Sequence, residues 1–195
     1  MEKRRIALYG GTFNPPHIGH SVVLEAVLER GYQVIAMPAG QPPHKALPPG
    51  SANAAQRLEM SRLMVRGLEN VAVSDFELNH TGASYTADTI EWLVETRPDA
   101  KVTLIVGADM LFSFRQWWHF ERILKLADVA AVCRASDQLG AVRDAAQSLG
   151  ASVIEHEPID ISSTKLRDML SRGEGREWLK PTIWDYIQAN KLYIS

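Results

Sequence analysis

Residues 8–20 decide the fold, and they read Leu8-Tyr9-Gly10-Gly11-Thr12-Phe13-Asn14-Pro15-Pro16-His17-Ile18-Gly19-His20. An apolar run ends at two glycines, and two prolines then lead into a segment with two histidines. This order is typical of a strand, a tight turn and the first turn of a helix. Glycines allow a tight exit from the strand and bring backbone N–H groups close to a ligand. A helix N-terminus favours a phosphate group, so the stretch predicts an anion site.

The two histidines of this stretch define a second feature. His17 and His20 are three positions apart, so at a helix start they project from one side of the first turn. Gly19, between them, removes a side chain where a nucleotide would need a close approach. The stretch lacks the Gly-Lys-Ser/Thr of a Walker loop and the third glycine of a dinucleotide fingerprint. No cysteine or carboxylate stands nearby at zinc-ligand spacing, so we expect no protein-held metal.

Short apolar runs alternate with helical patterns along the rest of the chain. We expect strands at Arg5–Tyr9, Gln33–Met37, Val71–Ser74, Val102–Val106 and Val129–Cys133, with a weaker one at Val153–Glu155. We expect helices around Val22–Val27 and Leu58–Met64, and at Thr86–Val94, Trp118–Leu126, Leu139–Leu149, Ser163–Leu170 and Pro181–Ala189. This alternation predicts an α/β fold, a Rossmann-like doubly wound and mostly parallel sheet with helices on both faces. A small helical part should follow from about residue 161.

The bulk composition limits the classes of protein that remain. A length of 195 residues suits one domain spanning 1–195, and a net charge of -2 without a basic block disfavours nucleic acid as a partner. Cys133 is the only cysteine, so no internal disulfide is expected. No apolar run approaches the roughly 20 residues that cross a bilayer. We therefore expect a cytoplasmic protein without a membrane partner; the oligomeric state stays open between monomer and dimer.

A second motif lies about 140 residues after the histidines, in Ile161-Ser162-Ser163-Thr164-Lys165-Leu166-Arg167. Ser162 or Ser163 suits a helix N-cap, where hydroxyl and N–H groups can hold phosphate oxygens. Arg167 adds a planar fork of donors. The first stretch resembles the HxGH signature of the nucleotidyltransferase superfamily, and the second resembles the ISSTxxR motif of small adenylyltransferases. A Ser-His-Asp hydrolase is disfavoured because no GxSxG elbow is present.

Four further stretches resemble bacterial nicotinate-nucleotide adenylyltransferases. They are the PPHK at residues 42–45, the Gly-Ala-Ser-Tyr-Thr-Ala-Asp-Thr at 82–89, the Gly-Ala-Asp at 107–109 followed by Trp117, and Arg134. The resemblance covers roughly positions 6 to 193. Asn14 stands where the family commonly has Asp, and Ala83 where it commonly has Pro. The first departure weakens a carboxylate role at that position, and the second concerns loop stiffness.

The resemblance implies an enzyme that transfers the adenylyl group of ATP to a pyridine mononucleotide in NAD biosynthesis, with Mg²⁺ accompanying ATP. It implies catalytic roles for three residues, namely His17, His20 and Arg167. It implies ATP contacts for Gly10, Gly11, Thr12, Phe13, Gly19, Lys45, Gly107, Asp109, Ile161, Ser162, Ser163 and Thr164. It implies contacts with the mononucleotide for Ser84, Tyr85, Thr86, Trp117 and Arg134. Without the resemblance, Trp117 would be interpreted as part of an apolar core cluster, and Ser84 as an ordinary helix cap.

Other functions stay open at this point. A pantetheine-phosphate adenylyltransferase and an enzyme preferring the amidated mononucleotide would share the two main motifs, although the stretches at 82–89 and 107–117 favour the nicotinate enzyme. A non-catalytic nucleotide sensor with the same fold would bind ATP without releasing pyrophosphate. A class I aminoacyl-tRNA synthetase is excluded mainly by size.

Overall fold

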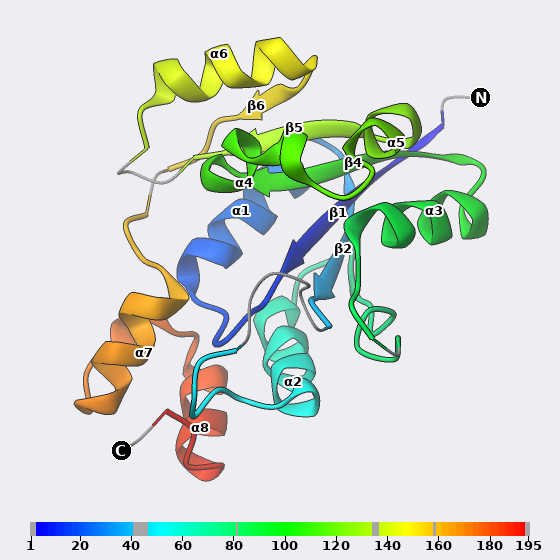
Figure 1. Ribbon diagram of the computed structural model, residues 1–195. Helices are drawn as coiled ribbons and strands as arrows, with labels where there is room; N and C mark the ends of the chain where they lie inside the picture. The colour runs from blue at the N-terminus through cyan, green and yellow to red at the C-terminus, as the bar shows by residue number, and fades with distance from the viewer. Residues whose placement is uncertain (1–2, 41–46, 81, 134–136, 158, 194–195) are drawn as a thin grey trace.

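A parallel β-sheet forms the centre of the computed structural model (Figure 1). The structure describes residues 3–40, 47–80, 82–133, 137–157 and 159–193. Within these residues the sheet has six strands in the order β3-β2-β1-β4-β5-β6, and all neighbours run parallel. The strands are β1 (Arg4–Gly11), β2 (Gln33–Pro38), β3 (Val71–Val73), β4 (Ala100–Gly107), β5 (Asp128–Val132) and β6 (Ser152–Ile154).

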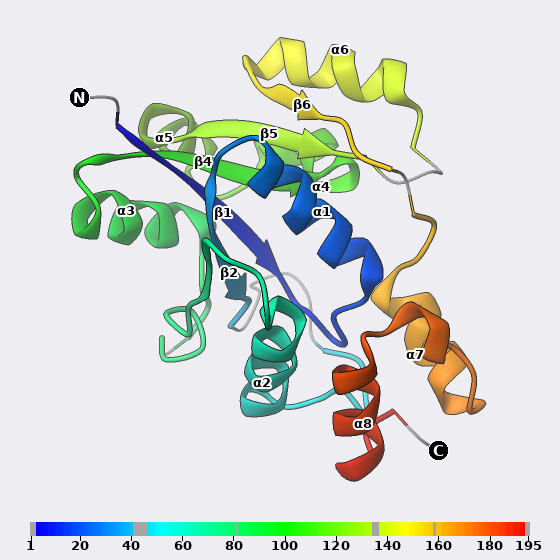
Figure 2. The ribbon, with the colours of Figure 1, turned by 180° about the vertical axis from the view of Figure 1, so that it is seen from behind.

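Helices cover both faces of the sheet (Figures 1 and 2). They are α1 (Ile18–Glu29), α2 (Ala54–Val65), α3 (Thr86–Thr96), α4 (Ala108–Phe112), α5 (Phe120–Leu126), α6 (Leu139–Leu149), α7 (Ser163–Ser171) and α8 (Pro181–Ala189), with 3₁₀ turns η1 (Phe114–Gln116) and η2 (Arg176–Trp178). Alternate residues of β1 join two separate cores. Ala7 and Tyr9 pack with side chains of α1, α2, α7 and α8, whereas Ile6 and Leu8 pack with those of α3 to α6. The predicted doubly wound α/β fold is confirmed.

All six predicted strands are present, with ends that differ by at most two residues. The helix predicted from Trp118 is wrong at its start, because His119 adopts a left-handed conformation with φ of 53° and α5 begins only at Phe120. The five-residue helix α4 was not predicted, since one turn and a half shows no periodicity to read.

The sheet reverses its winding direction between β1 and β4, which are neighbours in the sheet (Figure 1). After β1 the chain enters α1, which packs on one face; after β4 it enters α4, which packs on the other. In open parallel sheets ligands bind beyond the carboxyl ends of the strands at such a switch point. The fold thus directs attention to the turns that follow Gly11 and Gly107.

The predicted helical C-terminal part consists of α7, η2 and α8. It belongs to the same buried cluster as α1 and α2, through side chains such as Leu166 and Ile183. Pro181 stands at the first turn of α8, as predicted. No helix among the described residues is both long and apolar enough to cross a membrane. That residues 1–195 form one domain stays a prediction.

Candidate active site

Two glycines at the end of β1 and a buried aromatic ring shape the start of the turn that follows. A Cβ at Gly11 would lie 2.9 Å from the ring of Phe13, so Phe13 excludes a side chain there. Phe13 itself is 1% exposed and has a left-handed φ of 48°. A Cβ at Gly10 would meet no protein atom within 4 Å. The chain therefore passes close to its own core at Gly11 and faces open space at Gly10.

The two histidines lie against each other at the start of α1. His17 is the N-cap residue and His20 is the third residue of the helix, and their ring centroids are 3.7 Å apart. Nδ1 of His20 accepts a hydrogen bond from the backbone N–H of His17 at 3.1 Å. This bond requires a lone pair on Nδ1, so a neutral His20 carries its proton on Nε2. The backbone thus fixes a tautomer in which His20 Nε2 is a donor.

Gly19 allows the two sequence motifs to meet. A Cβ on Gly19 would lie 3.0 Å from Nδ1 of His17 and 3.2 Å from Cγ2 of Ile161. Ile161, the first residue of the second motif, is 2% exposed. A side chain at position 19 would require His17 or Ile161 to shift by a few tenths of an ångström. Figures 1 and 2 show the start of α7 beside the start of α1 in both views.

Direct hydrogen bonds join the second motif to the first. Ser162 caps α7 by accepting from the backbone N–H of Lys165 at 3.2 Å. The hydroxyl of Ser163 donates to the carbonyl oxygen of Pro15 at 2.9 Å. Arg167 donates through Nη1 to the carbonyl oxygen of Asn14 at 2.8 Å and through Nη2 to Oγ1 of Thr164 at 3.2 Å. The predicted convergence of the two motifs is therefore present in the structure.

The predicted mononucleotide residues Ser84, Tyr85 and Thr86 lie where α3 begins. Tyr85 is the N-cap and Thr86 the first helical residue. Ser84 does not cap the helix; its hydroxyl donates to Oε2 of Glu77 at 3.1 Å. Glu77 also accepts from Oγ1 of Thr89 at 2.8 Å and from the backbone N–H of Gly40 at 3.3 Å. This glutamate, which sequence reasoning missed, ties the end of β2 to the start of α3.

The loop after β4 carries the predicted Gly107, Asp109 and Trp117. A Cβ at Gly107 would lie 2.8 Å from Oδ1 of Asp109, so the carboxylate folds back over the glycine that caps α4. Trp117 is half-buried and packs against Phe114, with ring centroids 5.1 Å apart. Trp118 is 55% exposed and lies 5.5 Å from the ring of Tyr85. These rings form an aromatic surface, and Trp118 is more exposed on it than Trp117.

A buried arginine, Arg57 of α2, was not predicted from the sequence. It is 2% exposed, and its Nη1 donates to the carbonyl oxygens of Thr12 at 3.0 Å and Ala39 at 2.7 Å. Its Nη2 reaches the carbonyl oxygen of Gly40 at 3.5 Å. Burial lowers the pKa of the Arg57 guanidinium from its ordinary value. A single buried cation therefore holds together the segments that leave β1 and β2.

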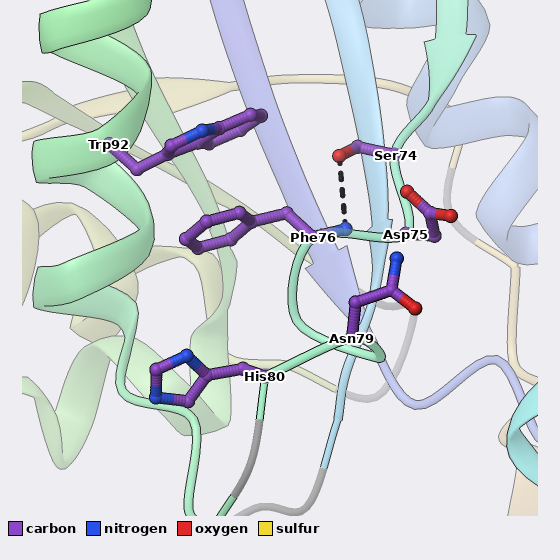
Figure 3. Close-up of a pocket in the computed structure, with 6 residues that line it drawn as sticks. All are labelled: Ser74, Asp75, Phe76, Asn79, His80 and Trp92. Carbon is purple, nitrogen blue, oxygen red and sulfur yellow. Dashed lines mark hydrogen bonds between the residues drawn. The ribbon is translucent and has the colours of Figure 1, made fainter.

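Two of the predicted site residues, Lys45 and Arg134, lie outside the described residues. The two cavities described lie away from the histidine pair. One, of about 300 Å³, is lined by a stack of Phe76 on Trp92 and by Ser74, Asp75, Asn79 and His80 (Figure 3). The other is lined by residues of the α5 region. Among the described residues, no group of three or more His, Cys, Asp or Glu could hold a metal ion.

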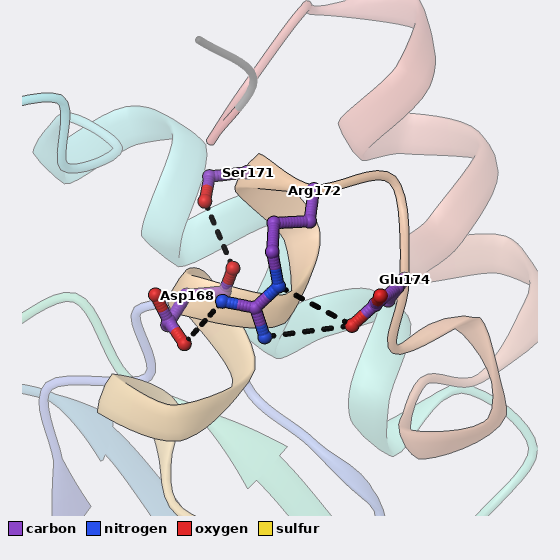
Figure 4. Close-up of polar contacts among 4 residues, drawn as sticks. All are labelled: Asp168, Ser171, Arg172 and Glu174. Carbon is purple, nitrogen blue, oxygen red and sulfur yellow. Dashed lines mark hydrogen bonds and ion pairs between the residues drawn. The ribbon is translucent and has the colours of Figure 1, made fainter.

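The far end of α7 has a different character from its start. Arg172 is exposed and donates to Asp168 at 2.6 Å and to Glu174 at 3.4 Å, while the hydroxyl of Ser171 donates to the carbonyl of Asp168 (Figure 4). These side chains pair with one another at the surface. The start of α7 bonds instead to the turn after β1.

Comparison with known proteins agrees with this geometry. The model of a family described as "Cytidylyltransferase-like" matches residues 8–169. A Synechococcus protein (strain JA-2-3B'a(2-13)) named "Probable nicotinate-nucleotide adenylyltransferase" is 37% identical, covering 100% of both chains. A Listeria monocytogenes protein (serotype 4a, strain HCC23) with the same name is 31% identical over 98% of both chains. The chain belongs to the cytidylyltransferase-like family and, within it, to the nicotinate-nucleotide adenylyltransferases.

Solved structures share the fold of this family member. A Plasmodium falciparum nicotinic acid mononucleotide adenylyltransferase complexed with NaAD matches with a TM-score of 0.82 at 18% identity, covering 97% of both chains. A structure of the same name complexed with APC matches with a TM-score of 0.80 at 17% identity. At these identities the likeness establishes the fold.

Proposed function

We propose that this protein transfers the adenylyl group of ATP to nicotinate mononucleotide, giving deamido-NAD and pyrophosphate in NAD biosynthesis. The observation that carries the proposal is the junction of the two motifs, in which Arg167 and Ser163 of α7 are bonded to the turn before His17. The names of the full-length relatives supply the reaction and the acceptor. ATP and the mononucleotide are cellular metabolites, so we place the protein in the cytoplasm.

The reaction is an in-line displacement at the α-phosphorus of ATP. An oxygen of the mononucleotide's 5′-phosphate forms a bond to that phosphorus, and the bond to the oxygen that bridges to the β-phosphate breaks. The electron pair leaves with pyrophosphate. The attacking phosphate is already anionic, so the protein needs no general base and contributes by positioning and by charge stabilisation.

We assign the charge stabilisation to the residues at the junction. Nε2–H of His20 donates to an oxygen of the α-phosphate, with His17 beside it at the N-terminus of α1. Arg167 and the N-terminal N–H groups of α7 hold the phosphates that leave. Lys45, which lies outside the described residues, is assigned to the same phosphates.

The other half of the proposed site binds the acceptor. The N-terminus of α3, at Tyr85 and Thr86, is placed to receive the nicotinate carboxylate, because helix N-termini favour anions. Trp117 is assigned to the pyridine ring, and Asp109 to the hydroxyls of a ribose. Arg134 is assigned to the acceptor as well.

Nucleotidyltransferases that use ATP usually need a divalent metal. The described residues include no cluster of ligands that would hold such an ion in place. We therefore propose that Mg²⁺ arrives on the phosphate oxygens of ATP, as part of the substrate.

The test is pyrophosphate release from MgATP with three acceptors compared side by side: nicotinate mononucleotide, its amide and phosphopantetheine. The proposal expects the highest kcat/KM with the nicotinate compound. A higher value with the amide or with phosphopantetheine would assign the enzyme to one of the rival activities. If ATP binds but no pyrophosphate is released with any of the three acceptors, the protein would be a non-catalytic nucleotide sensor. Arg167→Ala should abolish most of the release, and Arg172→Ala is its control, because Arg172 is the C-cap residue of α7 and lies outside the junction.

A further inference from the structure

Asn14 is a buried joint in the turn between β1 and α1. It is 1% exposed, and its side-chain oxygen accepts hydrogen bonds from the backbone N–H of Ala52 at 3.2 Å and from the hydroxyl of Tyr193 at 2.6 Å. Its amide nitrogen donates to Oγ of Ser51 at 2.8 Å. The turn that carries the histidines is thus attached to two distant segments through one side chain. A buried polar group in such a network is costly to leave without its partners.

The same residue also sets the position of Arg167. Nη1 of Arg167 donates to the carbonyl oxygen of Asn14, 153 positions away in the sequence. The hydrogen bonds of the Asn14 side chain restrain the residue. Its carbonyl oxygen, which accepts the hydrogen bond from Arg167, is thereby held in place. A movement of Asn14 would therefore shift both Arg167 and the chain that leads into His17.

Tyr193 supplies the shortest of these bonds. Its ring is 9% exposed within the core formed with α2 and α8, and its backbone has a left-handed φ of 60°, which bulky residues rarely adopt. Burial raises the pKa of the Tyr193 hydroxyl far above its ordinary value, so this group remains a proton donor at every pH at which the protein would be assayed. The hydroxyl donates to Oδ1 of Asn14 and also lies near the backbone N–H of Ala52 and the guanidinium of Arg167.

We infer that Tyr193 is a positioning residue for adenylyl transfer, whose hydroxyl holds Asn14 and, through it, Arg167 and the turn before His17. The inference rests on the proposed function. It adds a specific role for Tyr193, the last described residue of the chain, which acts through Asn14. The expected consequence is a loss in kcat, because Arg167 is assigned to charge that develops during the transfer, with little change in KM for the mononucleotide.

The test uses Tyr193→Phe, which removes one oxygen and keeps the ring. Tyr186→Phe is the matched control: Tyr186 lies on α8 and packs, half-buried, against the same cluster, and no hydrogen bond joins its hydroxyl to Asn14 among the described residues. Removal of one buried hydrogen bond corresponds to about 1 kcal/mol. We expect kcat of Tyr193→Phe to fall roughly five- to tenfold, with KM for nicotinate mononucleotide within about twofold and kcat of Tyr186→Phe within about twofold of the parent.

A purely structural role would lower the thermal midpoint of Tyr193→Phe and leave kcat unchanged at temperatures well below the transition. That outcome would overturn the inference. Different results would refute the proposed function and the positioning role of Tyr193. A parent protein and a Tyr186→Phe variant without pyrophosphate release would refute the proposed function. Activity in both, matched by Tyr193→Phe, would refute only the positioning role.

A double-mutant cycle tests whether the effect passes through Asn14. In an Asn14→Ala background the hydroxyl has no amide to hold, so adding Tyr193→Phe should lower kcat by less than about twofold. In an Asn14→Asp background the acceptor oxygen remains, and the full effect of Tyr193→Phe should return. The Asp variant also serves if Asn14→Ala does not fold. Equal losses in the Ala and Asp backgrounds would contradict the proposed route.

Discussion

The two halves of the proposed site differ in how firmly the protein holds them. At the junction of the motifs, Asn14, Ser163 and Arg167 are all engaged in hydrogen bonds to protein atoms. At the other, aromatic end, where the rings of Tyr85, Trp117 and Trp118 lie, Trp118 is 55% exposed and Trp117 is half-buried. The residues proposed to act on the phosphates are thus held by hydrogen bonds within the protein, whereas the residues proposed to bind the ring expose apolar surface.

This difference follows from what each half is proposed to do. Charge that develops on a transferring phosphate is stabilised by donors that are already in place, because no energy is then needed to reorganise them. Recognition of a flat ring depends on covering aromatic surface, which an exposed side chain provides. Substitutions at the junction should therefore act on kcat, and those at the aromatic end on KM for the acceptor.

The largest effect is expected at the centre of the rigid half. His20→Ala should lower kcat by about 10²–10³, because it removes a donor to the α-phosphate. Steady-state pyrophosphate release measures this change, and circular dichroism verifies the fold. A folded His20→Ala protein with nearly full turnover would contradict the assignment.

Arg57 tests how far the organisation of the rigid half depends on a buried cation. Arg57→Met leaves the carbonyl oxygens of Thr12 and Ala39 without this donor. We expect the free energy of unfolding to fall by about 3 kcal/mol, as measured by denaturant titration. Arg62→Met, at an exposed position of the same helix that pairs with Glu59, should change it by at most about 0.5 kcal/mol. Equal losses of unfolding free energy in the two variants would show that the buried hydrogen bonds of Arg57 contribute no more to stability than the exposed ion pair of Arg62.

Substitution of Trp117 or Trp118 should change KM for the mononucleotide rather than kcat. Trp117→Ala should raise KM for nicotinate mononucleotide about five- to tenfold, which corresponds to roughly 1 kcal/mol of lost ring contact, with kcat changed by less than about twofold. Trp118→Ala is the companion variant. A larger rise in KM for Trp118→Ala would transfer the ring contact to the more exposed tryptophan.

The smallest effect is expected at the far end of α7. Arg172→Ala removes exposed ion pairs to Asp168 and Glu174, so the free energy of unfolding should change by at most about 0.5 kcal/mol. Turnover should match that of the parent, whereas Arg167→Ala should lose most of it. A similar loss of turnover in both variants would mean that charge on α7, rather than contact at the junction, matters.

The sequence predicted those features that leave a local pattern. The strands appear as apolar runs, and the two motifs carry their glycines, histidines and serines at fixed spacing. Arg57, Glu77 and Tyr193 could not be found in this way, because their partners are carbonyl, hydroxyl and amide groups of segments distant in the chain. An isolated arginine or glutamate is by default a surface residue. Helix α4 and the start of α5 were missed for lack of periodicity and because of the left-handed His119.

The most direct measurement is a crystal structure of this protein with a non-hydrolysable ATP analogue and nicotinate mononucleotide. Hydrogen-bond donors of α1 and α7 should surround one triphosphate. Nε2 of His20 and the guanidinium of Arg167 should each lie about 3 Å from its oxygens. An analogue bound with its phosphates beyond the reach of either group would contradict the account.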